Sequence, residues 1–289
     1  MTTVGILMPG DMGHGVGQAL VAQGHRVMTA LDGRSQHTRQ LSDRAGIEDL
    51  GSIESCVAET DIILSILPPD RAIPQAQFIA EAMKKTGKTP AYADCNAISP
   101  MTMKRVASAF DGTGAVIIDS GIIGLNPIRS PPTRFYVSGP DCAPMEALNC
   151  EAIKVEKISD EIGRASALKM VYAAGTKGIW TLQTALLLTA ARQGVLEPLL
   201  EELAYSQTGP LQSMRSKIPF IPADAARWVP EMEEIAATFA DAGVTSGFHD
   251  GAAEIFRVLA RTPFAEETRE TLDTSRTLEQ ALAEYVKHL

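Results

Sequence analysis

The first half of the chain alternates short strand-like runs with helical segments, and this alternation limits the possible folds more than any other feature. The strand-like runs cover residues 4–8, 26–31, 62–67, 91–95 and 116–119, and residues 16–23 form the first helical segment. A repeated strand–helix–strand order predicts a parallel sheet with helical crossovers. We therefore expect an N-terminal α/β domain built on a doubly wound parallel sheet.

The second half of the chain is rich in Ala and Leu, and strand-like runs become scarce after about Val155. This change predicts two domains, an α/β domain over residues 1–160 and an all-α domain over residues 161–289, in keeping with about 100–200 residues per domain. Residues 162–193 carry apolar side chains on nearly all helical faces. We therefore expect a long interdomain helix that both domains or a second subunit cover, and hence a homodimer.

The overall charge and the positions of the Cys and His residues argue against several classes of protein. A net charge of −9 makes nucleic acid an unexpected partner. Polar residues interrupt the longest apolar stretch, around residues 179–191, so no membrane span is expected. The four cysteines lack metal-finger spacing, and the five histidines lack metal-ligand spacing. We expect a cytoplasmic protein with metal-free chemistry.

A glycine-rich segment, residues 9–17, follows the first strand, and a helix is expected directly after it. Glycines let the backbone approach a pyrophosphate, and the free N–H groups at a helix start bind anions. The segment predicts a dinucleotide site, although an ordinary strand-to-helix turn would also fit. The cofactor-binding residues expected here are Pro9, Gly10, Asp11, Met12 and Gly13.

The end of the second strand is where the 2′ position of the adenosine ribose is recognised. Asp32 would accept hydrogen bonds from a ribose diol and so favours NAD, whereas Arg34, Ser35 and Arg39 could hold a 2′-phosphate and so favour NADP. Solvated loop charges are the alternative for each residue. The balance leans slightly to NAD.

Four segments resemble the β-hydroxyacid dehydrogenase and 6-phosphogluconate dehydrogenase superfamily. They are the Gly-x-x-Gly turn with Met12-Gly13, the strand end Leu67-Pro68-Pro69, the segment Asp94 to Pro100, and Gly163-x-Ala165-x-x-x-Lys169. The resemblance implies a Rossmann domain, in which Leu67 and Pro68 lie along the cofactor and Asn96 lies near the nicotinamide ribose. It also implies that Lys169 is the general acid/base.

The chain departs from this family at two places. The family's substrate loop normally reads Asp-Ala-Pro-Val-Ser-Gly-Gly, and here residues 119–125 place Ile123 where the serine is expected. The paired asparagines after the catalytic lysine are replaced by Tyr172-Ala173. By position in the loop, the expected substrate-binding residues are Ser120, Gly121, Ile122 and Ile123.

The C-terminal half resembles a bacterial subfamily whose helical domain has no assigned function. Residues 167–174 and Gly247-Phe248-His249 carry this resemblance.

Lys169 lies in an otherwise apolar helical stretch, where burial would lower its pKa by up to about 3–5 units and suit it to proton transfer. On a regular helix Tyr172, Ala173 and Thr176 share its face. The hydroxyls of Tyr172 and Thr176 could orient a substrate oxygen, or could serve packing and local backbone bonding. A structural ion pair is the alternative for Lys169, and Lys177 is expected to be structural.

Three residues further along the chain could complete the site. Trp228 and Glu231 are expected to cap the substrate pocket, and His249 is a candidate second proton carrier. Surface ion pairs and a structural histidine are the alternatives.

The combined pattern predicts an NAD(P)-dependent oxidoreductase that moves hydride between nicotinamide and a secondary alcohol or carbonyl. The apolar residues at the expected site favour a substrate more apolar or bulky than the usual β-hydroxy acid. Two alternatives stay open: imine reduction on the same scaffold, and a dinucleotide-binding regulatory protein without catalysis.

Overall fold

The computed structural model describes residues 1–268 and 271–289, which divide into two units, Met1–Met170 and Val171–Leu289. The division falls about ten residues after the boundary expected at residue 160. The first residues of helix α7 (Arg164–Ala173) hydrogen-bond to strands of the first unit and so belong to it.

The first unit is built on an eight-stranded sheet of order β3-β2-β1-β4-β5-β6-β7-β8. Its strands are β1 (Thr3–Leu7), β2 (Arg26–Thr29), β3 (Glu48–Asp49), β4 (Ile62–Ser65), β5 (Ala91–Asp94), β6 (Ile117–Ile123), β7 (Thr133–Ser138) and β8 (Ile153–Ser159). All neighbouring strands pair in parallel except β6 and β7, which are antiparallel. The expected doubly wound α/β fold with its parallel sheet is confirmed for β1 to β6, and the antiparallel pairing adds β7 and β8, which the sequence did not predict. The β6–β7 connection is too short for a crossover, which needs about a dozen residues or more.

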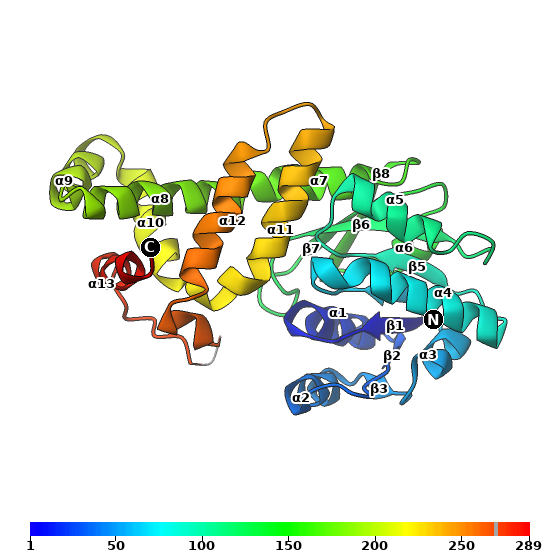
Figure 1. The fold of residues 1–289 in the computed structure, drawn as a ribbon. Helices are drawn as coiled ribbons and strands as arrows, with labels where there is room; N and C mark the ends of the chain where they lie inside the picture. The colour runs from blue at the N-terminus through cyan, green and yellow to red at the C-terminus, as the bar shows by residue number, and fades with distance from the viewer. Residues whose placement is uncertain (269–270) are drawn as a thin grey trace. The chain divides into compact units, whose positions relative to one another are not determined.

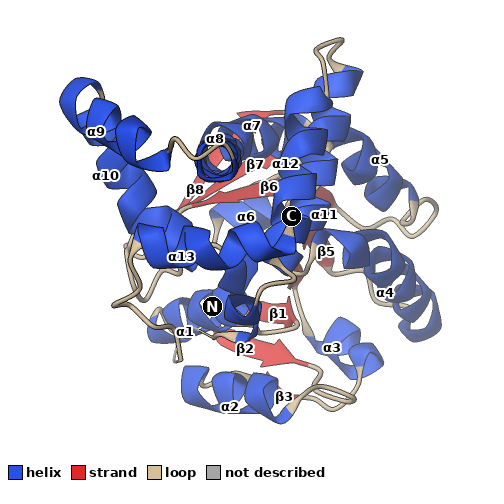
Figure 2. Ribbon diagram, turned by 60° about the vertical axis from the view of Figure 1, so that its left-hand side comes forward, coloured by secondary structure: helices blue, strands red, loops and turns tan. Residues whose placement is uncertain are grey.

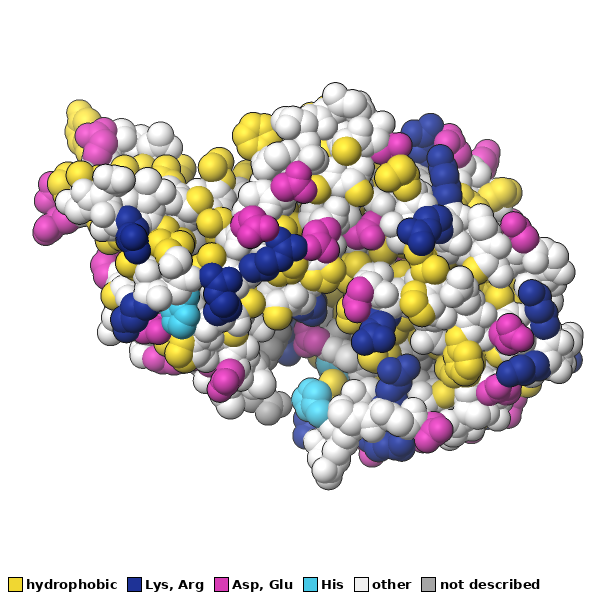
Figure 3. Space-filling view, viewed as in Figure 1, with side chains coloured by type: hydrophobic (Ala, Val, Ile, Leu, Met, Phe, Trp, Pro, Cys, Tyr) yellow, Lys and Arg dark blue, Asp and Glu magenta, His cyan; other side chains and the backbone are white. Residues whose placement is uncertain are grey.

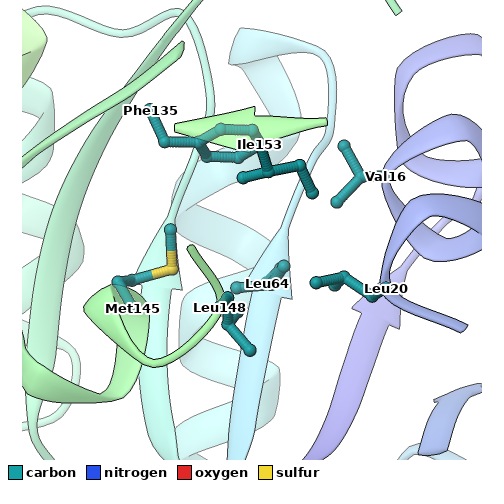
Figure 4. A pocket seen from close by; sticks show the side chains of 7 residues that line it. All are labelled: Val16, Leu20, Leu64, Phe135, Met145, Leu148 and Ile153. Atoms are coloured by element: carbon teal, nitrogen blue, oxygen red, sulfur yellow. The ribbon is translucent and has the colours of Figure 1, made fainter. Parts of the chain in front are cut away.

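Helices cover both faces of this sheet (Figures 1 and 2). They are α1 (Asp11–Ala22), α2 (Gln36–Ala45), α3 (Ile53–Glu59), α4 (Ala72–Thr86), α5 (Pro100–Ser108) and α6 (Ala143–Glu146), with the short 3-10 turn η1 (Pro69–Arg71). One core cluster joins α1 and α6 to the sheet, and the other joins α3, α4 and α5 to it. Figure 4 shows part of the first cluster, where seven apolar side chains from α1, the sheet and the segment around α6 meet. These side chains leave no room for even a water molecule between them, so this place is core packing.

In the described residues of the second unit, every regular element is a helix, as expected. They are the π-helical segment η2 (Ala174–Gly178), α8 (Ile179–Arg192), α9 (Leu196–Ser206), α10 (Thr208–Lys217), α11 (Pro222–Asp241), α12 (Gly247–Leu259) and α13 (Leu278–Tyr285), with 3-10 turns η3 (Ile218–Phe220), η4 (Pro263–Glu266) and η5 (Val286–His288). Helices α11 and α12 lie side by side (Figure 1). The chain stays helical through residues 164–192.

The surface of the protein carries charged side chains of both signs (Figure 3). Basic side chains are interspersed with acidic ones on the face shown in Figure 3, and the net charge is −9. None of the helices in residues 1–268 and 271–289 is long and apolar enough to cross a membrane.

Candidate functional site

The first element of the candidate site is the turn between β1 and α1. Met8 adopts a left-handed conformation with a φ of 56°, and the Gly10 amide donates to the Met8 carbonyl at 2.7 Å. Gly10 is the N-cap of α1 and has no side chain to cap the helix. No N-cap side-chain oxygen therefore accepts hydrogen bonds from the amides of the first helical turn. These amides are available to donate to an anion, so this end of the helix is suited to bind one.

Helix α1 begins at Asp11, whereas the sequence suggested a turn that continues to Gly17. Gly13, Gly15 and Gly17 therefore lie inside the helix. A Cβ on Gly13 would lie 3.2 Å from the Met8 carbonyl oxygen, and a Cβ on Gly17 would lie 2.5 Å from Cδ1 of Ile47. These glycines allow close packing of α1, and only the segment before Asp11 forms the turn.

Two residues at this turn were missed by the sequence analysis. The Asn126 side chain donates to the Asp11 carbonyl and accepts from the Ile128 amide at 2.9 Å. Arg129 forms an ion pair with the Asp11 carboxylate at 3.3 Å, which offsets a negative charge beside the anion-binding end of α1. Nothing local to residues 126–129 indicates this contact, because Asn126 and Asp11 are 115 residues apart.

The residues expected near the adenosine ribose follow β2. Asp32 is exposed, and the Arg34 guanidinium lies 3.4 Å from the Met8 sulfur, so Arg34 lies directly beside the turn. The Ser35 hydroxyl accepts from the Thr38 amide at 3.2 Å and caps α2. The Ser35 hydroxyl is therefore engaged in the cap of α2, whereas Arg34 lies at the turn before α1.

The ends of β4 and β5 are joined through Asn96, which is 2% exposed. Its side-chain oxygen accepts from the Leu67 amide at 2.5 Å, and its side-chain nitrogen donates to Ser65 at 3.1 Å and to Asp94 at 2.9 Å. Asn96 thus holds the loop that begins with Leu67 and Pro68. These hydrogen bonds fix the loop that is expected to lie along the cofactor. The Asn96 side chain thus makes its hydrogen bonds to other groups of the protein.

Lys169 lies next to β6, at the same edge of the sheet as the loops after β4 and β5. Asp94, the last residue of β5, pairs with Asp119, so β6 continues past the end of β5. A Cβ on Gly121 would lie 2.9 Å from Cβ of Lys169, which places that residue against this extension. Lys169 is partly exposed, so the expectation of a deeply buried amine was wrong. The strand order reverses between β1 and β4, where open α/β sheets bind ligands at the carboxyl ends of their strands.

The remaining residues of the expected substrate loop lie on β6. Ser120 is 1% exposed, and Ile122 belongs to the core of the unit at 6%. Side chains alternate along a strand, so Ile123 shares the face of Gly121 that meets α7. Because Ile122 is buried, a contact between its side chain and a substrate is disfavoured. Ile123 is partly exposed and is the better candidate for a substrate contact.

In the second unit, Glu231 forms an ion pair with Lys177 at 2.5 Å, and both side chains are largely buried. The Lys177 ammonium lies 5.3 Å from the Trp228 ring centroid, and Trp228 also packs against Trp180 and Phe256. The Lys177 ammonium therefore contacts both the Glu231 carboxylate and the Trp228 ring. A structural role for Lys177 agrees with this geometry.

Tyr172 and Thr176 do not form the regular face that the sequence suggested. The Thr176 hydroxyl donates to the Ala173 carbonyl at 3.1 Å, which confirms the alternative of a local backbone bond. The π-helical segment at residues 174–178 breaks the 3.6-residue repeat that was used to place Thr176. Tyr172 is 51% exposed, whereas Ala173 is buried.

His249 is buried between α12 and its neighbours, at 6% exposure. Its ring packs edge-on against Phe239, with 4.3 Å between centroids, and a Cβ on Gly178 would lie 3.4 Å from it. Nδ1 has no hydrogen-bond partner among the described residues. Burial lowers the pKa of His249, which favours a neutral packed ring.

Within residues 1–268 and 271–289, no group of three or more His, Cys, Asp and Glu side chains could hold a metal ion.

Known proteins resemble this chain in both halves. A protein of unknown activity from Methanothermus fervidus is 27% identical over 177 residues, which cover 61% of this chain and 66% of that protein. The 3-hydroxyisobutyrate dehydrogenase of Pseudomonas aeruginosa is 25% identical over 143 residues, 48% of this chain and 47% of its own. The chain therefore spans less than two thirds of the length of either curated relative.

Solved structures share the fold over nearly the whole chain. Mycobacterium tuberculosis 3-hydroxyisobutyrate dehydrogenase has a TM-score of 0.68 at 18% identity and covers 96% of this chain and 98% of its own. The Streptomyces aurantiacus imine reductase has a TM-score of 0.56 at 16% identity and covers 97% and 98%. Residues 3–143 match the NAD binding domain of 6-phosphogluconate dehydrogenase, and residues 190–259 match a domain of unknown function, DUF1932. Residues 3–143 thus form an NAD-binding domain of the 6-phosphogluconate dehydrogenase type, and a DUF1932 domain follows in the C-terminal half.

Proposed function

We propose that the protein is an NAD(P)-dependent oxidoreductase that transfers hydride between nicotinamide and a secondary alcohol or carbonyl, with Lys169 as general acid/base. One observation carries this proposal. Within the first unit, Lys169 packs against the part of β6 that extends past β5, at the edge of the sheet where helix α1 begins without a side-chain cap. A proton carrier and an anion-binding helix end share one edge.

The residues of this edge fit a dinucleotide. Gly10 leaves the start of α1 uncapped, and Gly13 lets α1 approach the backbone of Met8. Arg34, which lies beside the turn, and the exposed Asp32 would distinguish a 2′-phosphate from a ribose diol in this proposal. The nicotinamide ring supplies the hydride acceptor or donor when it is bound.

Lys169 would handle the proton that accompanies hydride transfer. In alcohol oxidation the C–H electron pair leaves as hydride, and the neutral amine of Lys169 takes the hydroxyl proton as the carbonyl forms. In carbonyl reduction the ammonium returns that proton to the oxygen. Each chemical step therefore leaves Lys169 in the opposite protonation state, and exchange of one proton with solvent restores it before the next turnover.

The proposed substrate is more apolar or bulky than a short β-hydroxy acid. Ile123 stands where the family has a serine, and Leu125 and Tyr172 are 64% and 51% exposed. Turnover that is best on short hydroxy acids and absent on bulky secondary alcohols would contradict this part of the proposal.

Imine reduction is the second candidate, because the fold is also similar to that of an imine reductase. Nitrogen would then replace oxygen at the reacting carbon. Rates on matched ketones and cyclic imines with one cofactor distinguish the two reactions.

The deciding experiment is a panel of alcohols, ketones and imines assayed with both NAD(H) and NADP(H) by absorbance of the reduced nicotinamide. Lys169→Ala should abolish turnover while nucleotide binding persists. Lys88→Ala is the matched control, since Lys88 is exposed and lies just before β5, at the opposite end of that strand. Nucleotide binding without turnover on the whole panel would favour a catalytically silent regulatory protein.

We also propose a homodimer formed through α8. Ile179, Leu182 and Leu186 are 48%, 65% and 41% exposed and follow one another at helical spacing, so they form an uncovered apolar stripe. Sedimentation that gives only a 30.9 kDa monomer would refute this. A cytoplasmic location is proposed because all four cysteines are free thiols.

A further inference from the structure

The carboxylate of Asp119 lies at the centre of the contact between β6 and α7. Asp119 is 0% exposed. Its Oδ2 accepts from the Gly163 amide at 2.9 Å, the Ser166 amide at 3.0 Å and the Ser138 hydroxyl at 2.8 Å, and its Oδ1 accepts from the Ser166 hydroxyl at 2.6 Å. Burial raises the pKa of the Asp119 carboxyl, and the four hydrogen bonds oppose that rise.

Ser138 completes the cap of the helix. It is the cross-strand neighbour of Asp119 on β7, and its hydroxyl accepts from the Ala165 amide at 3.0 Å. The amides of residues 163, 165 and 166 are thus all held by side chains from two adjacent strands. Gly163, with a φ of 102°, turns the chain into the helix at this point. The start of α7 is fixed to the sheet by bonds that span 27 to 47 residues of sequence.

Two residues beyond Asp119, the strand and the helix touch through their backbones. A Cβ on Gly121 would lie 2.7 Å from the Ala165 carbonyl oxygen and 2.9 Å from Cβ of Lys169. The first of these atoms belongs to the helix backbone and cannot move alone. Any larger residue at position 121 would therefore push the first turns of α7, and Lys169 with them, away from β6.

We propose that Asp119 and Gly121 are positioning residues for Lys169: Asp119 anchors the start of α7, and Gly121 sets how closely Lys169 approaches β6. This inference rests on the proposed function, in which Lys169 exchanges the substrate proton. The two residues act through Lys169 and need no contact with substrate. Proton transfer requires its donor and acceptor within hydrogen-bond reach, so a small shift of the helix lowers turnover more than it lowers cofactor binding.

Gly121→Ala is the most direct test. Gly121 does not have a positive φ, so the backbone accepts alanine and the effect comes from the contact alone. We expect kcat to fall at least about tenfold, because a displacement near 1 Å can reduce rates by about 100-fold. The Kd for the nicotinamide nucleotide should stay within about twofold of wild type, since α1 is untouched. Gly251→Ala, where an added Cβ meets nothing within 4 Å, is the matched control and should leave both values unchanged.

A second readout does not depend on activity. Lysine amines carrying ¹³C-methyl groups titrate separately by NMR, and the Lys169 signal is the one missing from Lys169→Ala. The midpoint for Lys169 should move in Gly121→Ala and stay in Gly251→Ala. If Gly121→Ala does not fold, Ser166→Ala takes its place, because it removes only the hydroxyl bond to Asp119 and keeps the backbone bonds.

The outcomes separate this inference from the proposed function. A folded Gly121→Ala or Ser166→Ala protein with reduced kcat, a shifted Lys169 titration and unchanged nucleotide binding supports it. Wild-type kcat or a wild-type Lys169 titration in the folded variants overturns it, even where Lys169→Ala is inactive. Full activity in Lys169→Ala rejects the proposed acid/base role instead, and the titration alone then decides whether Gly121 positions the lysine.

Discussion

The ion pair between Lys177 and Glu231 makes a strong prediction about stability. The Nζ–Oε1 distance is 2.5 Å, and the side chains are only 14% and 8% exposed, so water screens this pair weakly. Removing one partner of a buried pair leaves an uncompensated charge and typically costs about 3–5 kcal/mol. Lys177→Met also loses the contact with Trp228, worth about 0.5–2 kcal/mol. We therefore expect Glu231→Leu to lower the free energy of unfolding by about 3–5 kcal/mol, and Lys177→Met to lower it by somewhat more.

The double variant Lys177→Met/Glu231→Leu should be more stable than either single variant. Replacing both charges by apolar side chains of similar volume is often neutral or stabilising. Only the contact with Trp228 is then lost, which gives an expected loss of about 0.5–2 kcal/mol. A double-mutant cycle measured by urea unfolding should thus give a coupling energy of several kcal/mol.

The neighbouring ion pair on α11 is the control. Arg227 and Asp224 lie 2.6 Å apart with exposed fractions of 56% and 24%, and such a pair contributes about 0.2–1 kcal/mol. Arg227→Met should therefore have a small effect. Single-variant losses below about 1 kcal/mol at the buried pair, or a coupling energy near zero, would refute the argument from burial.

The same variants test the expected substrate contact of Glu231. If Glu231 serves only the ion pair, the double variant keeps the wild-type KM for a substrate found in the panel. A KM raised at least about tenfold, equivalent to about 1.4 kcal/mol of lost substrate binding, would instead indicate that Glu231 contacts the substrate.

Three further predictions concern single residues. Burial lowers the pKa of His249 below 6.5, so the folded protein binds this proton less tightly than the unfolded chain, and stability is lost as the pH falls below about 6.5. His249→Phe should therefore lose less unfolding free energy than wild type between about pH 7.5 and pH 5.5 in urea titrations, and an equal loss contradicts the burial argument. Arg34→Ala should raise the Kd for NADP roughly 10- to 100-fold, from a charge-assisted hydrogen bond worth about 1.5–3 kcal/mol, with a smaller change for NAD. Equal changes for both nucleotides would show that Arg34 does not contact the 2′-phosphate. Ile123→Ser should raise kcat/KM for short hydroxy acids relative to bulky alcohols, and an unchanged ratio would remove Ile123 from the substrate site.

The sequence predicts those parts of the fold that depend on local pattern. The apolar run at residues 4–8 predicted β1, and the glycines after it predicted the turn. The Ala- and Leu-rich second half of the chain predicted the helical unit. Strands β3, β7 and β8 were missed: β3 has only two residues, and the alternation of charged and apolar residues in β8, which is typical of a half-exposed edge strand, was not recognised. Where α1 begins was also missed, because glycine disfavours helix interiors and only the contact with Ile47 explains Gly17 inside one.

The candidate site depends on contacts that no local pattern contains. Lys169 was identified from its position in a motif, yet the bonds that fix its helix come from Asp119 and Ser138, 47 and 27 residues before the helix residues that they cap. The partner of Glu231 is 54 residues away. The π-helical segment at residues 174–178 likewise has no sequence signature, and it displaced Thr176 from its expected place.

The structure narrows the argument for an apolar substrate. Two apolar residues of the expected site have packing roles, because Ile122 lies in the core of the first unit and Trp228 packs against Trp180, Phe256 and Lys177. Their apolar character is explained by folding and carries no information about a ligand. Ile123, Leu125 and Tyr172 keep accessible surface. Exposed apolar side chains are not needed for the stability of one chain, so these three residues alone now support a bulky substrate, and substitutions there test substrate choice without disturbing a core.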